Sequence, residues 1–217
     1  MKKRVFFIQL LILQLCVSAY AYDDGDFQVW HTENQEKKIN GHSKVSLEEE
    51  VRFADDASEL FYHHYDAGYQ YDLNKHFSLG VNYRQVYEKK QGKFKEENRP
   101  HVNAILKFSP AGMKFEDRNR LEYRHFAYQE DSWRYRNKFS VKKTVKFFGQ
   151  ELQPFLADEI FLNLNGIDLN RNRFYSGFGF EITKIAKAEV FYLLQSSKNS
   201  GEWNNSNILG TKLKLVF

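Results

Sequence analysis

Charged side chains alternate with apolar ones along two neighbouring segments of the chain, residues 113–125 and 133–143. The charged positions, which share one parity within each segment, are Lys114, Glu116, Arg118, Arg120, Glu122, Arg124, Arg134, Arg136, Lys138 and Lys142. A period of two places such positions on a single face of a β-strand. Arginine can hold a carboxylate or a phosphate through two parallel hydrogen bonds, and cations outnumber anions on both segments. This charged ladder therefore predicts a basic wall that attracts or binds anions.

Residues that could carry catalysis are less clearly organised. Histidines and serines that could supply a base and a nucleophile occur without a G-x-S-x-G or other nucleophile signature: His63, His64, His76, His101, His125, Ser78, Ser140 and Ser176. His63 and His64 are adjacent, so in a strand they point to opposite faces and cannot bind one metal ion together. We therefore predict no catalytic residue, no metal site and no cofactor.

The elements that would position the charged ladder are β-strands, because alternation with a period of two recurs along the chain. The candidate strands cover 45–53, 61–73, 77–87, 101–108, 113–125, 133–143, 152–163, 173–182, 188–196 and 207–217. Strands of about ten residues cross a bilayer when tilted, and no segment beyond residue 21 approaches about 18 consecutive apolar residues, which excludes spanning helices. The sequence predicts an all-β, antiparallel up-and-down transmembrane β-barrel of about 10 to 12 strands. A soluble sandwich or lipocalin-like barrel is the alternative fold.

The last strand gives the predicted barrel its orientation. In residues 209–217 an apolar face alternates with a polar face that carries Lys212 and Lys214, and the chain stops at Phe217. This ending resembles the closing strand of bacterial outer-membrane β-barrels, whose terminal Phe is read by the barrel-assembly machinery. We therefore take Phe217 as an assembly signal and place it at the periplasmic end.

With that orientation, connections of two lengths alternate along the chain. Short periplasmic turns are expected at 73–76, 109–112 and 183–187, and longer extracellular loops at 88–99, 163–172 and 197–206. Residues 27–34 form an awkward eleventh strand, because single-chain bacterial barrels have even strand counts with both termini in the periplasm. Either residues 22–42 lie outside the barrel wall, which leaves ten strands, or they contain a first strand of a twelve-stranded barrel.

Two interpretations of the charged ladder stay open. Arg or Lys facing lipid at the bilayer midplane would cost about 2–4 kcal/mol each, so the ladder must face the lumen. There it lines a pore that favours anions or binds an acidic solute, or it pairs across the lumen with Glu48, Glu50, Asp66, Asp72, Glu159 and Glu181. A barrel of about ten strands encloses little room, which favours pairing across the lumen.

The N-terminus is typical of an exported protein. Basic residues at positions 2–4 precede an apolar stretch at 5–17, and Ala19-Tyr20-Ala21 fits a signal-peptidase site, so we expect cleavage after Ala21. Removing residues 1–21 removes the only cysteine, Cys16, and with it any disulfide or thiolate site. The net charge of +4 includes the three basic residues at 2–4, so the mature chain is close to +1 and a nucleic-acid partner loses its support. The aromatic content of 17% suits a barrel with interfacial girdles.

Several short motifs, taken together, are similar to a bacterial family of outer-membrane β-barrels classed as domain of unknown function 2490. They are residues 26–30, 47–53, 82–84, 118–124, 153–155, 159–161 and 172–174. The resemblance implies location and fold and no established activity. It also implies that Arg52, Arg84, Arg118, Arg120, Glu122, Glu159 and Arg173 belong to a lumen network. Parity agrees except at Asp158 and Glu159, of which either could face inward.

Together with the ladder, this gives a lumen-lining charged network with thirteen members. They are Arg52, Arg84, Glu116, Arg118, Arg120, Glu122, Arg124, Arg134, Arg136, Lys138, Glu159, Arg173 and Glu181. We expect an integral outer-membrane barrel of a Gram-negative bacterium, formed by residues 43–217, that acts without catalysis as a narrow porin-like channel or an envelope structural protein. Its expected partners are outer-membrane lipid, the barrel-assembly machinery and a small anionic solute. The alternative is a lipid-modifying or hydrolytic enzyme that uses His64 and a lumenal or rim hydroxyl.

Overall fold

The computed structural model describes residues 24–199 and 201–217. The predicted signal peptide lies outside this described part of the chain. The elements are β1 (Asp26–Lys38), β2 (Ser43–Ala54), β3 (Glu59–Asp72), β4 (Phe77–Lys90), β5 (Lys93–Phe108), η1 (Pro110–Gly112), β6 (Met113–Phe126), β7 (Ser132–Lys143), β8 (Val145–Phe147), β9 (Gln150–Asn163), β10 (Asp168–Glu181), β11 (Ala186–Asn199) and β12 (Glu202–Val216). No helix among the described residues is long and apolar enough to cross a membrane.

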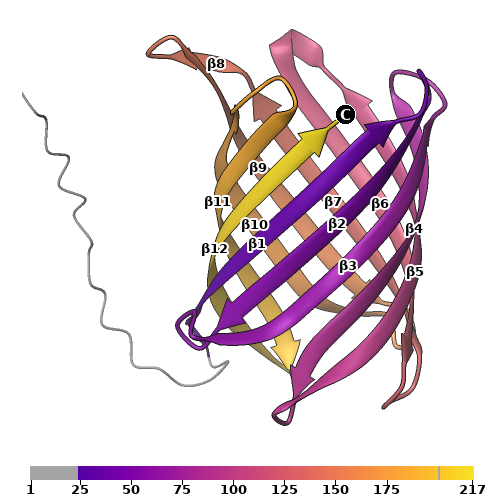
Figure 1. Ribbon diagram of the computed structural model, residues 1–217. Helices are drawn as coiled ribbons and strands as arrows, with labels where there is room; N and C mark the ends of the chain where they lie inside the picture. The colour runs from indigo at the N-terminus through magenta and orange to yellow at the C-terminus, as the bar shows by residue number, and fades with distance from the viewer. Residues whose placement is uncertain (1–23, 200) are drawn as a thin grey trace, which may run out of the picture.

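Eleven strands close into a barrel, and the short β8 extends the hairpin between β7 and β9 (Figure 1). The all-β barrel is the predicted fold, and its strand count lies within the predicted range. It is neither ten nor twelve, because residues 27–34 belong to β1, a full strand of the wall. Successive strands of a meander alternate in direction, so an odd number leaves the first and last strands running the same way.

The closing pair, β1 with β12, is therefore parallel, which corrects the prediction of a wholly antiparallel barrel. Asp26 is in register with Ser206 and Glu36 with Val216. The backbone of Phe217 continues the seam, with its N–H donating to Glu36 O at 2.9 Å and its carbonyl accepting from Lys38 N at 3.1 Å. The start of β1 and the C-terminus consequently lie at opposite ends of the barrel (Figure 1).

The long loops that the sequence predicts are mostly strand. β4 and β5 stay paired out to Lys90 and Lys93, and β11 and β12 stay paired out to Asn199 and Glu202. Gln91 and Gly92 both have positive φ, 52° and 76°, as expected for a two-residue hairpin turn whose twist matches its strands. Polar side chains on both faces of the strand ends hide the alternation, but the backbone ladder continues. The prediction of loops at 88–99 and 197–206 is wrong for this reason, and the predicted loop at 163–172 shrinks to residues 164–167.

The barrel has polar side chains inside and apolar ones outside. Among the described residues, 20 polar or charged side chains are buried against 12 hydrophobic ones, which is the reverse of a soluble domain. Large apolar side chains such as Leu79, Val81 and Val102 are about half exposed on the outer face. The outer face is interrupted by acidic residues, with Glu33 in register with Glu49.

One stretch of the lumen is apolar. Trp30, Phe155, Ala157, Tyr175, Leu193 and Ile208 form a buried cluster, with Phe191 packed against it. Two glycines make room for Phe191: a Cβ at Gly210 would lie 2.1 Å from its ring, and one at Gly177 would lie 2.5 Å from its Cβ. Substitution at either position therefore requires Phe191 or the backbone to move.

Candidate functional site

The charged residues of the lumen are concentrated in the middle of the barrel. Of the thirteen residues predicted from sequence, eight are buried: Arg52, Arg84, Arg120, Glu122, Arg134, Arg136, Glu159 and Arg173. Four more are partly buried: Glu116, Arg118, Arg124 and Lys138. The last, Glu181, lies at the rim, where its exposed carboxylate pairs with Lys187. The structure also settles which member of the pair at 158 and 159 faces inward, since Glu159 is 1% exposed.

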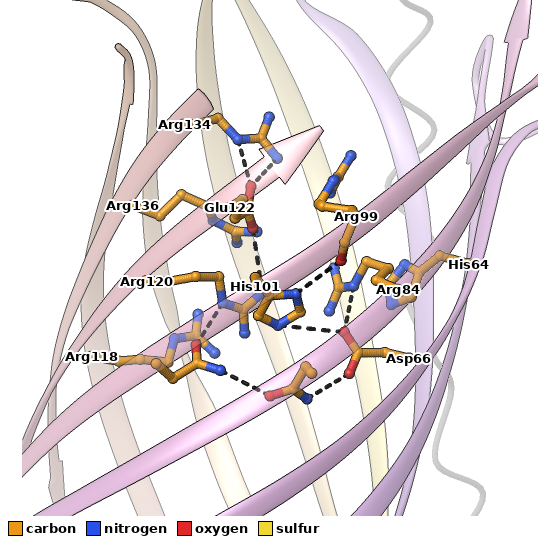
Figure 2. A network of polar contacts seen from close by, with 12 residues as sticks. His64, Asp66, Arg84, Arg99, His101, Arg118, Arg120, Glu122, Arg134 and Arg136 are labelled. Atoms are coloured by element: carbon orange, nitrogen blue, oxygen red, sulfur yellow. Dashed lines mark hydrogen bonds and ion pairs between the residues drawn. The ribbon is translucent and has the colours of Figure 1, made fainter. Parts of the chain in front are cut away.

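Glu122 is the centre of the first cluster (Figure 2). Arg134, directly opposite it on β7, donates from Nε to Oε2 at 2.7 Å, and Arg136 donates from Nη1 to Oε1 at 2.9 Å. Arg120, two residues away on the same face of β6, adds an Nη1 contact at 3.5 Å. The carboxylate itself is fully buried. Three guanidinium groups thus share one negative charge.

Glu159 and Glu97 are centres of the same kind. Glu159 pairs with Arg136 at 2.8 Å, with Arg118 at 3.0 Å and with Arg173 at 3.8 Å. It also accepts a hydrogen bond of 2.9 Å from the Tyr175 hydroxyl. Glu97 accepts from two guanidinium groups, those of Arg99 and Arg124. We call these three glutamates and the seven arginines around them the cationic wall.

The wall formed by β2, β3 and β4 has a different balance. Arg84 pairs with Asp66 at 2.7 Å and with Glu48 at 3.2 Å, and Lys212 of β12 reaches Glu48 at 3.2 Å. Arg52 donates from Nε to Glu50 at 2.7 Å. Three carboxylates therefore face three cations, and we call this set the balanced wall.

Amide side chains connect the two walls. Arg120 Nε donates to Asn103 at 2.7 Å, Asn103 donates to Asn82 at 2.9 Å, and Asn82 donates to Asp66 at 2.7 Å. Asn82 lies against Gly68, where a Cβ would come within 2.2 Å of its amide nitrogen. The result is a continuous hydrogen-bonded belt around much of the lumen (Figure 2).

Several members of this belt were not among the residues predicted from sequence. Glu97 and Arg99 were assigned to a loop, and His101 and Asn103 were not assigned to the lumen. Their alternation with Asn98, Pro100 and Val102 is a usable signal, but the density of charge at 88–99 conceals it. All four are buried.

Three cavities lined by the described residues follow one another along the lumen. A distal vestibule of about 560 Å³ lies at the end opposite Phe217, and a proximal vestibule of about 600 Å³ lies at the Phe217 end. Between them is a central cavity of about 150 Å³. It shares Arg84 and Arg173 with the distal vestibule, and Lys138 and Lys212 with the proximal one. The smallest of the three cavities therefore lies at the belt.

Cations dominate the lining of all three cavities. Ten Lys or Arg and one acid, Glu88, line the distal vestibule. Eight cations and four acids line the central cavity, and eight cations and three acids line the proximal vestibule. Lys138, in the central cavity, has its ammonium 3.6 Å from the centre of the Tyr175 ring. Such a basic interior favours anions throughout its length.

Aromatic rings hold several of the guanidinium groups in place. Four of them lie around the buried ring of Phe161 at 4.4–5.5 Å from its centre: Arg134, Arg136, Arg171 and Arg173. Arg52 lies against both Trp30, at 3.7 Å, and Tyr62, at 4.0 Å. Cation–π contacts of this kind contribute about 0.5–2 kcal/mol and orient the planar groups.

The predicted catalytic candidates do not come together. His64 is fully buried and contacts Glu48 at 3.4 Å, while the Ser78 hydroxyl donates to Asp72. Among the described residues, one hydrogen bond joins a histidine to a hydroxyl: His31 Nδ1 with Thr211 Oγ1, 2.8 Å apart on the outer face of the seam. That pair was not predicted from sequence. No group of three or more potential metal ligands occurs in the described part of the chain.

One titrating contact joins the loop between β6 and β7 to the end of β6. Asp131 accepts a hydrogen bond of 2.9 Å from His125 Nδ1 and another of 3.0 Å from the amide of Phe126. The hydrogen bond from His125, followed by those from Tyr123 and Phe126, lowers the pKa of Asp131 to about 2. This contact fixes the loop between β6 and β7.

The chain matches a known protein family. The model of a family described as "Protein of unknown function (DUF2490)" matches residues 27–207, which covers the chain from β1 into β12. The family membership that the sequence motifs indicated is thereby confirmed. No curated protein matches the chain.

Proposed function

The chain belongs to the DUF2490 family, which is described as of unknown function, and from that premise we propose that it is an integral outer-membrane β-barrel forming a narrow channel for small anions. The observation that carries the proposal is the excess of cations along all three lumen cavities. Its expected surroundings are outer-membrane lipid on the apolar face and water inside. A narrow, basic lumen passes small anions in preference to cations.

The distribution of side chains supports the membrane location. The wall strands are 12–16 residues long, enough for a tilted strand to cross a bilayer. Buried charge inside and exposed apolar side chains outside suit a barrel in lipid. Envelope fractionation, together with a heat-dependent shift in gel mobility, tests this location. Recovery of the exported protein in the soluble periplasmic fraction would contradict it.

Conductance in planar bilayers tests the channel. We expect small single-channel currents and, across a KCl gradient, a reversal potential of the sign that chloride selectivity gives. A correctly folded barrel that shows no conductance would leave the role of an envelope structural protein, and cation selectivity would overturn the anion proposal.

Recognition of Phe217 by the assembly machinery is part of the same proposal. Its backbone is committed to the seam, but its side chain is 58% exposed on the outside, where a second protein can contact it. Phe217→Ala should therefore reduce the amount of barrel inserted into the membrane of living cells while leaving refolding in detergent unchanged. An equal loss in both settings would indicate a role in stability instead.

One contact favours a second candidate, a hydrolase acting on membrane lipids. Thr211 bonds to His31 Nδ1, and His31 Nε2 lies 3.5 Å from Glu33, which is the order of a nucleophile, a base and an orienting carboxylate. In such an enzyme Thr211 Oγ would attack an ester carbonyl as His31 takes its proton, and the ester C–O bond would break as His31 gives that proton to the departing alcohol. Water, deprotonated by His31, would then hydrolyse the acyl–threonine ester to a carboxylic acid and restore the Thr211 hydroxyl. The backbone amides around Thr211 pair with β1 and β11, so they leave no free donors for an oxyanion, which ranks this candidate second. If overexpression of the native protein leaves the envelope lipid composition unchanged, as overexpression of Thr211→Val does, the hydrolase candidate is excluded.

A further inference from the structure

The distal vestibule holds more positive charge than the protein itself neutralises. Its lining contains ten cations against Glu88. Five of these ten cations belong to the cationic wall, whose seven arginines share only Glu97, Glu122 and Glu159. Buried charge without a partner is costly, so a structure that concentrates it gains from binding counter-charge.

Two arginines at the base of the vestibule have donors to spare. Arg171 contacts the Phe161 ring, at 5.5 Å, and makes no ion pair with any described residue. Arg136 is buried, and its Nε has no hydrogen-bond partner among the described residues. Arg173, beside them, uses Nε on Gln195 and lies 3.8 Å from its nearest carboxylate. These guanidinium groups come from two different strands, β7 and β10, and surround the same ring.

We propose that the distal vestibule is a binding site for a compact, water-soluble anion that carries two or more phosphate or carboxylate groups. Several guanidinium groups can each bind one such group through paired hydrogen bonds, whereas a monovalent anion engages only one of them at a time. A volume of about 560 Å³ is within the range of small-molecule sites. Because the wall is closed and turn residues such as Gln91 and Gln129 line this end, the ligand enters from the aqueous mouth. The site depends on the barrel and not on conduction through it.

The test is calorimetric titration of the full-length barrel, folded in a zwitterionic detergent, with pyrophosphate and with citrate at constant ionic strength. We expect saturable binding of at least one, and no saturable binding of acetate or chloride over the same range. Arg171→Gln should weaken binding by about tenfold, since it removes one charge-assisted contact. Lys146→Gln is the matched control, because it removes the same charge from the exposed β8 hairpin at the opposite end.

Each outcome decides the proposal. Binding of pyrophosphate alone or citrate alone supports it and identifies the group that is recognised. Equal affinities for pyrophosphate and chloride, or equal effects of Arg171→Gln and Lys146→Gln, would overturn it. If Arg171→Gln does not fold, Lys90→Gln at the rim of the vestibule replaces it, with weaker binding again expected. If the barrel conducts ions but binds neither pyrophosphate nor citrate, only the binding-site proposal fails. If it binds but does not conduct, only the channel proposal fails.

Discussion

On the balanced wall three carboxylates meet three cations, whereas on the cationic wall seven guanidinium groups share three carboxylates. Both walls consist of buried and partly buried residues, and both belong to the same hydrogen-bonded belt. Pairing one for one is sufficient to place charge inside a barrel, as the balanced wall demonstrates. The surplus on the other wall therefore serves something other than packing, and we assign it to anions.

The two walls should differ most in the free energy of unfolding that is lost when a carboxylate is removed from each. Glu122→Gln leaves three buried arginines without their shared counter-charge, and we expect it to lower the free energy of unfolding by about 3–5 kcal/mol. Asp66→Asn should cost less, about 1–3 kcal/mol, since Arg84 keeps Glu48 and an amide can still accept from Asn82. Urea unfolding of the two variants in lipid measures both. Equal losses would mean that the two walls do not differ in the way proposed.

A charge added to the outer face of the barrel has no partner if that face lies in lipid, as we propose. Val102 is half exposed on that face, and Val102→Arg should cost about 2–4 kcal/mol in a bilayer. Leu73→Arg, in the turn after β3, should cost about 0–1 kcal/mol because it is close to the interface. Unfolding titrations in vesicles compare the two. A negligible cost for Val102→Arg would indicate that the outer face is hydrated.

The apolar stretch of the lumen differs from both walls, because its stability depends on the fit between side chains and not on charge. At Gly177 a new Cβ would lie 2.5 Å from the carbonyl oxygen of Val190, so we expect Gly177→Ala to cost about 1–3 kcal/mol. The cost should not depend on salt, unlike that of Glu122→Gln. Gly41→Ala, which meets nothing within 4 Å, is the control. Thermal unfolding at low and high salt provides the measurement, and a salt-dependent effect at Gly177 would contradict this explanation.

If the surplus cations set ion preference, a smaller effect should appear in conductance. Lys138 lines the central cavity and is paired with a ring in place of a carboxylate. Lys138→Gln should therefore lower the preference for chloride measured by reversal potential. Lys146→Gln, outside the lumen, should leave that preference unchanged. A result in which both variants behave like the native protein would show that Lys138 does not set the ion preference.

The smallest effect is expected at an exposed ion pair, where water screens charge and neither wall contributes. The pKa of Asp131, usually 3.8, is lowered to about 2 in the folded protein by His125, Tyr123 and the Phe126 amide. A lowered pKa means that the contribution to stability is complete above the usual value and is lost as pH falls through about 2. Hydrogen exchange at the Phe126 amide, measured between pH 4 and 2, reports the loss of this contribution. In Asp131→Asn we expect this amide to exchange faster at every pH. Acceleration with falling pH in the variant as well would assign the change to another group.

The alternation of polar and apolar residues was sufficient to predict the strands that carry the charged ladder. The predicted segments 113–125 and 133–143 agree with β6 and β7 to within one residue at each end. Parity placed twelve of the thirteen charges of the predicted network at buried or partly buried positions, because successive side chains of a strand point to opposite faces. The ends of β4 and β5 were missed where charge occupies both faces and no alternation remains.

Which charges pair depends on the register between neighbouring strands. The sequence pattern of a single strand does not determine that register. Arg118, Lys138 and Glu159 stand side by side on three neighbouring strands, yet Arg118 reaches past Lys138 to Glu159. Closure is likewise a property of the whole barrel: the rule of even strand counts, applied to 22–42, excluded the eleven-stranded solution that the chain adopts.

The parallel seam also has a consequence for the order of folding. Apart from the seam, neighbouring wall strands can form one hairpin at a time, but β1 and β12 pair residues such as His31 and Thr211, which are 180 positions apart. Contacts at such separation form slowly, so the open sheet persists with two unpaired edges. Glu33, Gln35 and Lys37 place polar groups along the β1 edge, which discourages pairing with other chains. We therefore expect β1 to be held open and soluble until β12 has been made, and the barrel to close in a single late step.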